Sequence, residues 1–85
     1  MTKFNYVVTD EMGIHGRPAG VLVKECTKFK STISLNCKGK SADAKKIMSV
    51  MSLGAKKGDN VEVSIDGADE AAAKTALQTF FKENF

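Results

Sequence analysis

The sequence predicts a single α+β domain over residues 1–85, in which a four-stranded antiparallel sheet is covered on one face by three helices. Four segments alternate apolar and polar side chains with the period of two that is typical of half-buried strands. Three segments carry apolar side chains at the spacing of one helical face. The expected order is β-α-β-β-α-β-α. Because every strand shows or permits one polar face, solvent is expected on the side of the sheet opposite the helices.

The N-terminal segment predicts a strand followed by a helix. Residues 4–8 alternate as a strand, and Gly13 ends that segment. The helix is expected to begin near residue 15 or 16, because Pro18 is tolerated in a first turn, where its missing N–H is not required. Its apolar face is expected to consist of Ala19, Leu22, Val23 and Cys26.

The middle of the chain predicts a hairpin and a short helix. Residues 32–37 alternate, and Lys38-Gly39 offers a tight turn into a short strand at 40–43. Ile47, Val50 and Met51 have helical spacing, but Gly54 stops the segment after about two turns. A helix this short needs tertiary support.

The C-terminal third predicts a strand and the longest helix. Gly58-Asp59 turns the chain into residues 61–66, which alternate strictly until Gly67 ends the strand. Asp69 and Glu70 lie near the positive end of the following helix, and Lys82 lies near its negative end. The expected buried face of this helix is Ala73, Ala76, Leu77 and Phe80.

Composition excludes several classes of protein. The chain of 85 residues is 42% hydrophobic and 27% charged, which argues against a disordered tail or a fibre. No apolar run approaches the roughly 20 residues that span a bilayer, and no secretory signal is evident, so we expect a cytoplasmic protein without membrane insertion. The sequence carries no signal for oligomeric state, and a monomer is the default expectation. The net charge of +3 is a mild bias toward acidic partners. Nucleic acid is not expected as a partner, because aromatic side chains are not interleaved with the basic ones.

Two cysteines are too few for a disulfide scaffold and fit no paired zinc-ligand spacing, so free thiols and no metal site are expected. Cys26 and Cys37 are both interpreted as packing residues. Of the two, Cys37 is the more reactive if it is exposed.

His15 is the one histidine, and it lies where the strand pattern gives way to the helix. Unpaired N–H groups at a helix N-terminus favour a neutral, nucleophilic ring near pH 7 and then welcome an anion. The backbone N–H groups of Gly16 and Arg17 could donate to a phosphoryl group on that ring, and the guanidinium of Arg17 could pair with it. From the spacing alone, the favoured interpretation is an ordinary surface histidine at a helix start with Arg17 as a solvated charge, because a lone histidine is usually uninformative.

The run Gly-Ile-His-Gly-Arg-Pro-Ala at 13–19 is joined by Lys-Lys-Ile-Met-Ser-Val-Met-Ser-Leu-Gly at 45–54 and Gly-Ala-Asp-Glu at 67–70. Together these motifs closely resemble HPr, the histidine-containing phosphocarrier family of the bacterial sugar phosphotransferase system. The resemblance covers essentially the whole chain and implies an open-faced β-sandwich. It also implies that Nδ1 of His15 accepts a phosphoryl group from Enzyme I and passes it to the IIA domains of sugar permeases, that Arg17 assists the transfer, and that no bound cofactor is needed.

The resemblance further implies a docking patch beside His15, formed by Gly20, Ile47, Met48 and Met51. Core filling is the competing interpretation for the last three, and an exposed share is expected as well, because methionines adapt to differently shaped partners.

Two departures from the family pattern stand out. Gly16 occupies a position where family members usually carry alanine, and transfer is expected to survive because the N–H is kept. In Gram-positive relatives the serine before Ile-Met is phosphorylated by HPr kinase, but here Lys46 occupies that position and cannot take a phosphate. Regulation through this serine is therefore expected to be lost, unless it has moved to Ser49 or Ser52. The alternative function is an HPr-like regulator that binds a transcription factor or metabolic enzyme without carrying phosphoryl groups.

Overall fold

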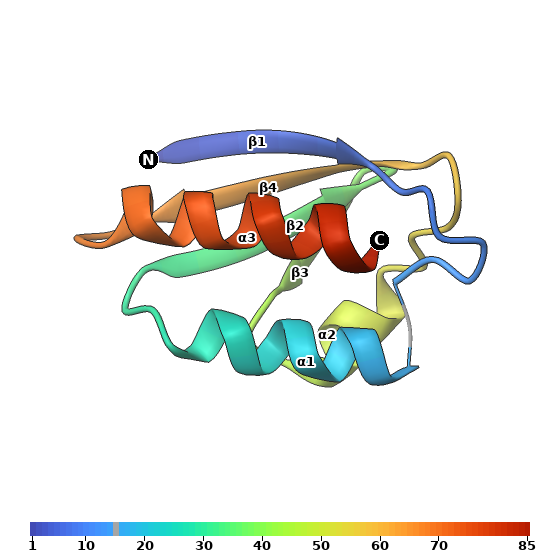
Figure 1. The fold of residues 1–85 in the computed structure, drawn as a ribbon, viewed down its shortest axis with the longest axis horizontal. Helices are drawn as coiled ribbons and strands as arrows, with labels where there is room; N and C mark the ends of the chain where they lie inside the picture. Colours follow the sequence, from blue (N-terminus) through green and yellow to red (C-terminus); the bar gives the residue numbers. More distant parts are fainter. Residues whose placement is uncertain (15) are drawn as a thin grey trace.

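The computed structural model describes residues 1–14 and 16–85. Its elements follow in the predicted order (Figure 1). The strands are β1 (Thr2–Val7), β2 (Thr32–Cys37), β3 (Lys40–Asp43) and β4 (Asn60–Asp66). The helices are α1 (Gly16–Thr27), α2 (Ile47–Ser52) and α3 (Glu70–Asn84). The first strand begins before the predicted residue 4 and ends before residue 8. The N–H of Val8 still donates to Asp59 O (3.0 Å), but Asp59 donates its own N–H to Lys56 O (2.9 Å) and Gly58 takes its place as donor to Val8 O (2.8 Å).

The four strands form one antiparallel sheet in the order β1-β4-β2-β3. β4 therefore lies between the first strand and the hairpin, with Val63 opposite both Phe4 and Leu35. The turn of that hairpin is the predicted Lys38-Gly39, where both residues have positive φ (53° and 80°).

The alternating pattern divides the sheet into an apolar and a polar face. The side chains toward the helices are buried or, for Tyr6, half-buried: Phe4, Tyr6, Ile33, Leu35, Cys37, Ala42, Val61, Val63 and Ile65. On the other face, Lys3, Asn5, Ser34, Asn36, Glu62 and Ser64 meet solvent, and Val7 is the apolar exception. The sheet is therefore covered on one side only.

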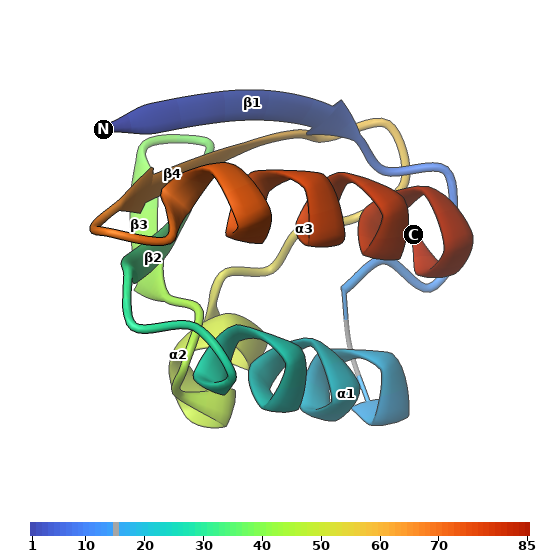
Figure 2. The same cartoon turned by 60° about the vertical axis from the view of Figure 1, so that its left-hand side comes forward.

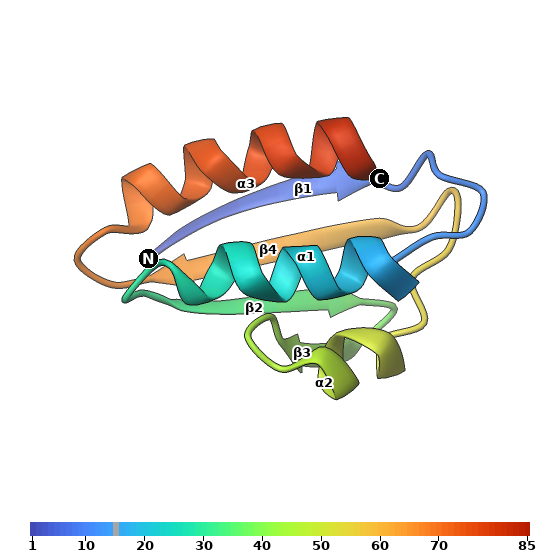
Figure 3. The ribbon, with the colours of Figure 1, turned by 60° about the horizontal axis from the view of Figure 1, so that its bottom comes forward.

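The helices lie together on the apolar side of the sheet (Figures 1 and 3). α1 and α3 run side by side, and the short α2 obtains its tertiary support by packing against α1 and β3 (Figure 2). The buried face of α1 is Ala19, Leu22 and Cys26, with Val23 only partly buried.

The buried face of α3 differs from the prediction at its C-terminal end. Phe81 is fully buried, whereas Phe80 is half-buried, because the face continues in steps of four from Ala73 through Leu77 to Phe81. The Phe81 ring makes edge-on contacts with the rings of Phe4, Tyr6 and Phe85, at centroid distances of 6.0, 5.6 and 5.3 Å. Of the predicted face, Ala73 and Leu77 are fully buried, whereas Ala76 and Phe80 are half-buried and Phe80 packs against the edge of the core.

Both cysteines are free and buried, as expected of packing residues. Burial raises the pKa of the Cys26 thiol to about 12. Burial also raises the pKa of Cys37, which is only 2% exposed. The condition under which Cys37 would be reactive is therefore not met.

The loop after α1 is tied to the start of α3 by Asp69. Its carboxylate accepts the N–H groups of Lys30 (2.8 Å) and Ser31 (3.0 Å) and the hydroxyl of the buried Ser31. The Ser31 hydroxyl, followed by the Lys30 N–H, holds the pKa of Asp69 below its usual value. This clamp fixes the end of the molecule opposite the start of α1.

The pKa of Asp69 is lower in the folded protein than in the unfolded chain, where it is about 4. The Asp69 carboxylate therefore contributes its full stabilisation when the pH is above the unfolded-state pKa, and this stabilisation is lost as the pH falls through the folded-state pKa. Urea unfolding between pH 7 and pH 3 should therefore show stability falling at the acid end. Asp69→Asn should be less stable at pH 7 and should lose less on acidification. Asp59 and Glu70, whose pKa values are also lowered, leave a residual acid dependence in the variant. If the free energy of unfolding depended on pH equally in both proteins, the stabilising role assigned to the Asp69 carboxylate would be contradicted.

Candidate functional site

The loop between β1 and α1 is held in place by backbone hydrogen bonds to the segment that precedes β4. Val8 exchanges backbone hydrogen bonds with Gly58 and Asp59, at 2.8 and 3.0 Å. At the far end of the loop, the N–H of the buried Ile14 donates to Ala55 O (3.1 Å). The chain is therefore fixed immediately before position 15 by a segment some forty residues later in the sequence.

Gly13 permits this close approach. It has a φ of +71°, and its N–H donates to Asp10 O (3.0 Å). A Cβ at this position would overlap the carbonyl oxygen of Ala55 and lie 2.9 Å from Lys56 Cα. Only glycine fits here, so the residue that the sequence suggested merely as a strand end is part of the site's framework.

The start of α1 supplies the predicted phosphate-binding groups. His15 lies outside the described residues, and α1 begins directly after it with the exposed Gly16 and Arg17. N–H groups in the first turn of a helix have no intrahelical acceptor, so this backbone can donate to an anion. The φ of Gly16 is +55°, a left-handed conformation that favours glycine, and no heavy atom of the described residues, apart from its chain neighbours and its own helix backbone, lies within 4 Å of where its Cβ would be. Glycine therefore keeps the backbone N–H at this position and also adopts the required φ more easily than alanine would.

The four predicted docking residues lie on the neighbouring helices α1 and α2. Gly20 is partly buried on α1. On α2, Met48 is 75% exposed, Met51 42% and Ile47 41%, whereas Val50 alone points fully into the core. Core filling therefore explains Ile47 and Met51 only in part and Met48 hardly at all.

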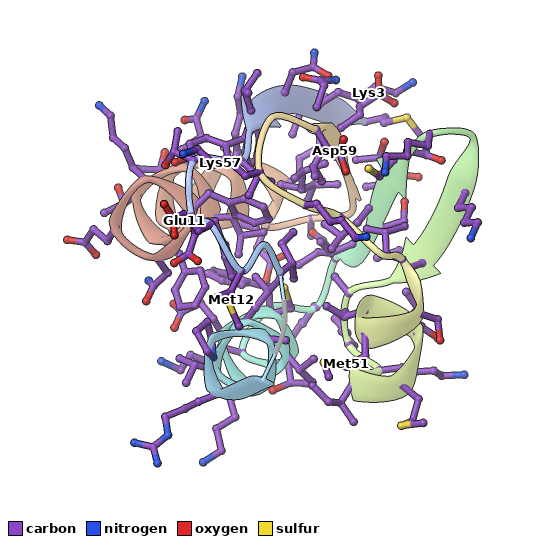
Figure 4. All side chains as sticks on the ribbon, turned by 90° about the vertical axis from the view of Figure 1, so that its right-hand side faces the viewer. Lys3, Glu11, Met12, Met51, Lys57 and Asp59 are labelled. Atoms are coloured by element: carbon purple, nitrogen blue, oxygen red, sulfur yellow. The ribbon has the colours of Figure 1, made fainter. Side chains whose placement is uncertain are left out.

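Sequence reasoning missed Met12. It lies on the loop before α1 and is 68% exposed. Figure 4, which looks onto this end of the molecule, shows Met12 beside the N-terminal end of α1 and Met51 on the α2 side of the same end. Helical periodicity could not reveal it, because it belongs to a loop. The available signal was an apolar side chain in an otherwise polar turn, close to the histidine in sequence.

Exposed lysines lie on the elements that carry this apolar surface: Lys24 on α1 and Lys46 directly before α2. The exposed Lys57 and Glu11 lie at the same end of the molecule as Met12 and Met51 (Figure 4). These three lysines, here called the basic rim, favour acidic partners. Among residues 1–14 and 16–85, no three His, Cys, Asp or Glu side chains gather so as to hold a metal ion. In that same part of the chain, no helix has both the length and the apolar character to cross a membrane.

Lys46 is the N-cap residue of α2 and makes no side-chain cap hydrogen bond. A cation at this position opposes the helix dipole, and the first-turn N–H groups lack a side-chain acceptor. Lys46→Asp should therefore raise the free energy of unfolding by about 1 kcal/mol, measured by urea denaturation. Lys46→Ala, which removes the charge without supplying an acceptor, is the matched control. Equal stability of the two variants would contradict the capping argument.

Comparison with known proteins gives a consistent result. Residues 2–83 match the family model described as "PTS HPr component phosphorylation site". The chain is 41% identical to a phosphocarrier protein HPr of Mycoplasma genitalium, over 99% of this chain and 97% of that protein. It is 40% identical to a phosphocarrier protein HPr of Xylella fastidiosa, over 100% of this chain and 96% of that protein.

Solved structures agree with these sequence relatives. A crystal structure of HPr-C-His from Thermoanaerobacter tengcongensis superposes with a TM-score of 0.94 at 35% identity, covering 100% of this chain and 96% of that one. Crh, a Bacillus subtilis protein whose structure is described as a swapped, intertwined dimer, superposes with a TM-score of 0.78 at 33% identity, covering 99% and 97%. The four-stranded open sheet with three helices is thus shared with both.

Proposed function

The chain belongs to the HPr family of phosphocarrier proteins of the phosphotransferase system, and on that premise we propose that His15 is its phosphoryl-accepting residue. Nδ1 of His15 takes the phosphoryl group from phosphorylated Enzyme I and passes it to the IIA domains of sugar permeases. The protein acts as a stoichiometric carrier with a phosphohistidine intermediate, without a bound cofactor or metal. We further propose that it works as a monomer in the cytoplasm.

The start of α1 suits a group that must be held and then released. The backbone N–H groups of Gly16 and Arg17 can donate to the phosphoryl oxygens, and the exposed Arg17 guanidinium can pair with them. One arginine and one helix terminus leave the group accessible on its outer side. The partner can then supply the remaining stabilisation of the transition state.

Docking is assigned to the apolar surface beside this helix start, formed by Gly20, Ile47, Met48 and Met51. Its exposed α2 side chains offer apolar contact, and the surrounding lysines steer acidic partners. Flexible methionines can repack against Enzyme I and against several IIA domains in turn. Short-lived complexes of moderate affinity follow from so small a surface.

Serine-dependent regulation is proposed to be absent at position 46, because Lys46 offers no hydroxyl group. Of the two remaining candidates on α2, Ser49 is partly buried, and the Ser52 hydroxyl donates to Met48 O (2.7 Å). Incubation with HPr kinase and ATP should leave the protein without phosphate. Kinase-dependent phosphate at Ser49 or Ser52 would show that regulation has moved along the helix.

The observation that carries the carrier proposal is the match to the HPr family over residues 2–83, with His15 and Arg17 present in its phosphorylation-site motif. The test is incubation with phosphoenolpyruvate and Enzyme I, followed by intact-mass spectrometry. One acid-labile phosphate should appear on the parent protein and none on His15→Ala. A folded parent that stays unmodified, with an Enzyme I active on another HPr, would instead favour the regulatory alternative.

A further inference from the structure

Three of the four methionines of this protein lie on the loop before α1 or on α2, the segments to which we assign transfer and docking. The chain has four methionines, and all are exposed: Met1 by 72%, Met12 by 68%, Met48 by 75% and Met51 by 42%. Met12, Met48 and Met51 belong to the loop before α1 and to α2. Met1 lies at the opposite end (Figure 1), where its amino group pairs with Asp66 and Glu70 at 3.5 and 3.3 Å.

The cysteines do not compete for an oxidant that arrives from solvent. Cys26 is fully buried and Cys37 nearly so, with 0% and 2% of each residue exposed. Burial also raises the pKa of both thiols, so neither forms the reactive thiolate near neutral pH. Thioethers are therefore the sulfur groups that a small oxidant can reach.

We propose that Met12, on the loop before α1, and Met48, on the docking surface, are two peroxide-sensitive modification sites whose oxidation suppresses docking and thereby phosphoryl transfer. The proposal rests on the function proposed above. The thioether sulfur attacks one oxygen of a hydroperoxide, the O–O bond breaks, and that oxygen remains on sulfur as a sulfoxide. The sulfur is oxidised by two electrons, while the other peroxide oxygen takes up a proton and leaves as water or alcohol. A dithiol-dependent reductase reverses the change, consuming two thiols and releasing a disulfide and water.

Methionine oxidation is expected to weaken the complex with a partner without destabilising the unbound carrier. In the free protein, a sulfoxide on a side chain about two-thirds or more exposed remains hydrated and disturbs little packing. In a docked complex, the same polar S=O group is buried against a partner that was contacting an apolar thioether. Burial of an unpaired polar group weakens binding by roughly tenfold or more.

The experiment oxidises the protein with hydrogen peroxide, maps the sulfoxides by peptide mass spectrometry and measures phosphoryl transfer from phosphorylated Enzyme I at subsaturating carrier. The parent should carry sulfoxide at Met12 and Met48, transfer at least tenfold more slowly, keep its unfolding midpoint, and recover after methionine sulfoxide reductase and dithiothreitol. The matched variant Met12→Leu/Met48→Leu/Met51→Leu retains Met1. For each protein, the transfer rate after peroxide is divided by its own rate before peroxide. This ratio should stay near one for the variant, although its Met1 is oxidised.

Three results would overturn the inference while leaving the carrier function intact: unchanged transfer in the oxidised parent, equal loss in the leucine variant, or a lowered unfolding midpoint that accounts for the loss. Failure of Met12 and Met48 to oxidise when Met1 does would overturn it equally. Absence of transfer before any peroxide is added would instead reject the proposed function, and the inference with it.

Discussion

Gly13→Ala is expected to lower the free energy of unfolding by about 2–5 kcal/mol. The left-handed φ of +71° costs an L-residue about 1–2 kcal/mol, and the overlap of the new Cβ with Ala55 O and Lys56 Cα adds about 1–3 kcal/mol. A domain of this length has roughly 4–13 kcal/mol in total, so the variant should be marginal at 37 °C. Relief of the overlap also requires Ala55 to move away from the Ile14 N–H. Urea denaturation gives the loss directly.

Gly54→Ala is the matched control. Gly54 has almost the same φ, +70°, but apart from its chain neighbours no heavy atom of the described residues lies within 4 Å of its Cβ position. It should therefore lose only the backbone contribution of about 1–2 kcal/mol. Equal losses in the two variants would show that the contact with Ala55 does not determine the choice of glycine at position 13.

The local patterns of the sequence were sufficient to predict every helix and strand. Alternation in residues 32–37 and 61–66, together with a helical stripe on the longest segment, reports directly which side chains face the core. These signals are short-range, because period and turn chemistry depend on neighbouring residues. Alternation therefore predicted that β1 exists, but its bounds, Thr2–Val7 in place of the predicted 4–8, depend on its pairing with β4, which is distant in sequence.

Contacts between distant segments could not be predicted in this way. The overlap that restricts position 13 comes from Ala55, and nothing near Gly13 in the sequence indicates that the two meet. The helical stripe of α3 predicted Phe80, whereas it is Phe81 that packs against Phe4 and Tyr6 in the core, and these partners lie on a distant strand. Met12 was missed for a similar reason, since exposure beside a helix start depends on how a loop is folded.

Arg17→Ala is expected to slow phosphoryl transfer by about 10²–10³-fold, the usual effect of removing one preorganised group that stabilises transferred charge. Arg17 is exposed in the first turn of α1, so the free energy of unfolding should change by no more than about 0.5 kcal/mol. Arg17→Lys should recover part of the rate, because it keeps the charge but loses the planar pair of donors. Rapid-quench measurement of transfer from phosphorylated Enzyme I distinguishes the three proteins.

Lys24→Ala separates this local role from general attraction to acidic partners. Lys24 is an exposed cation on the same helix, about 10 Å farther along its axis from Arg17. Its removal should reduce the association rate only modestly, and the reduction should fade at high salt because exposed charges are screened. If Arg17 contacts the phosphoryl oxygens directly, as proposed, the Arg17→Ala defect should persist at high salt. If both variants slowed phosphoryl transfer by the same factor, and if both defects disappeared at high salt, Arg17 would be part of the basic rim and not a residue of the transfer step.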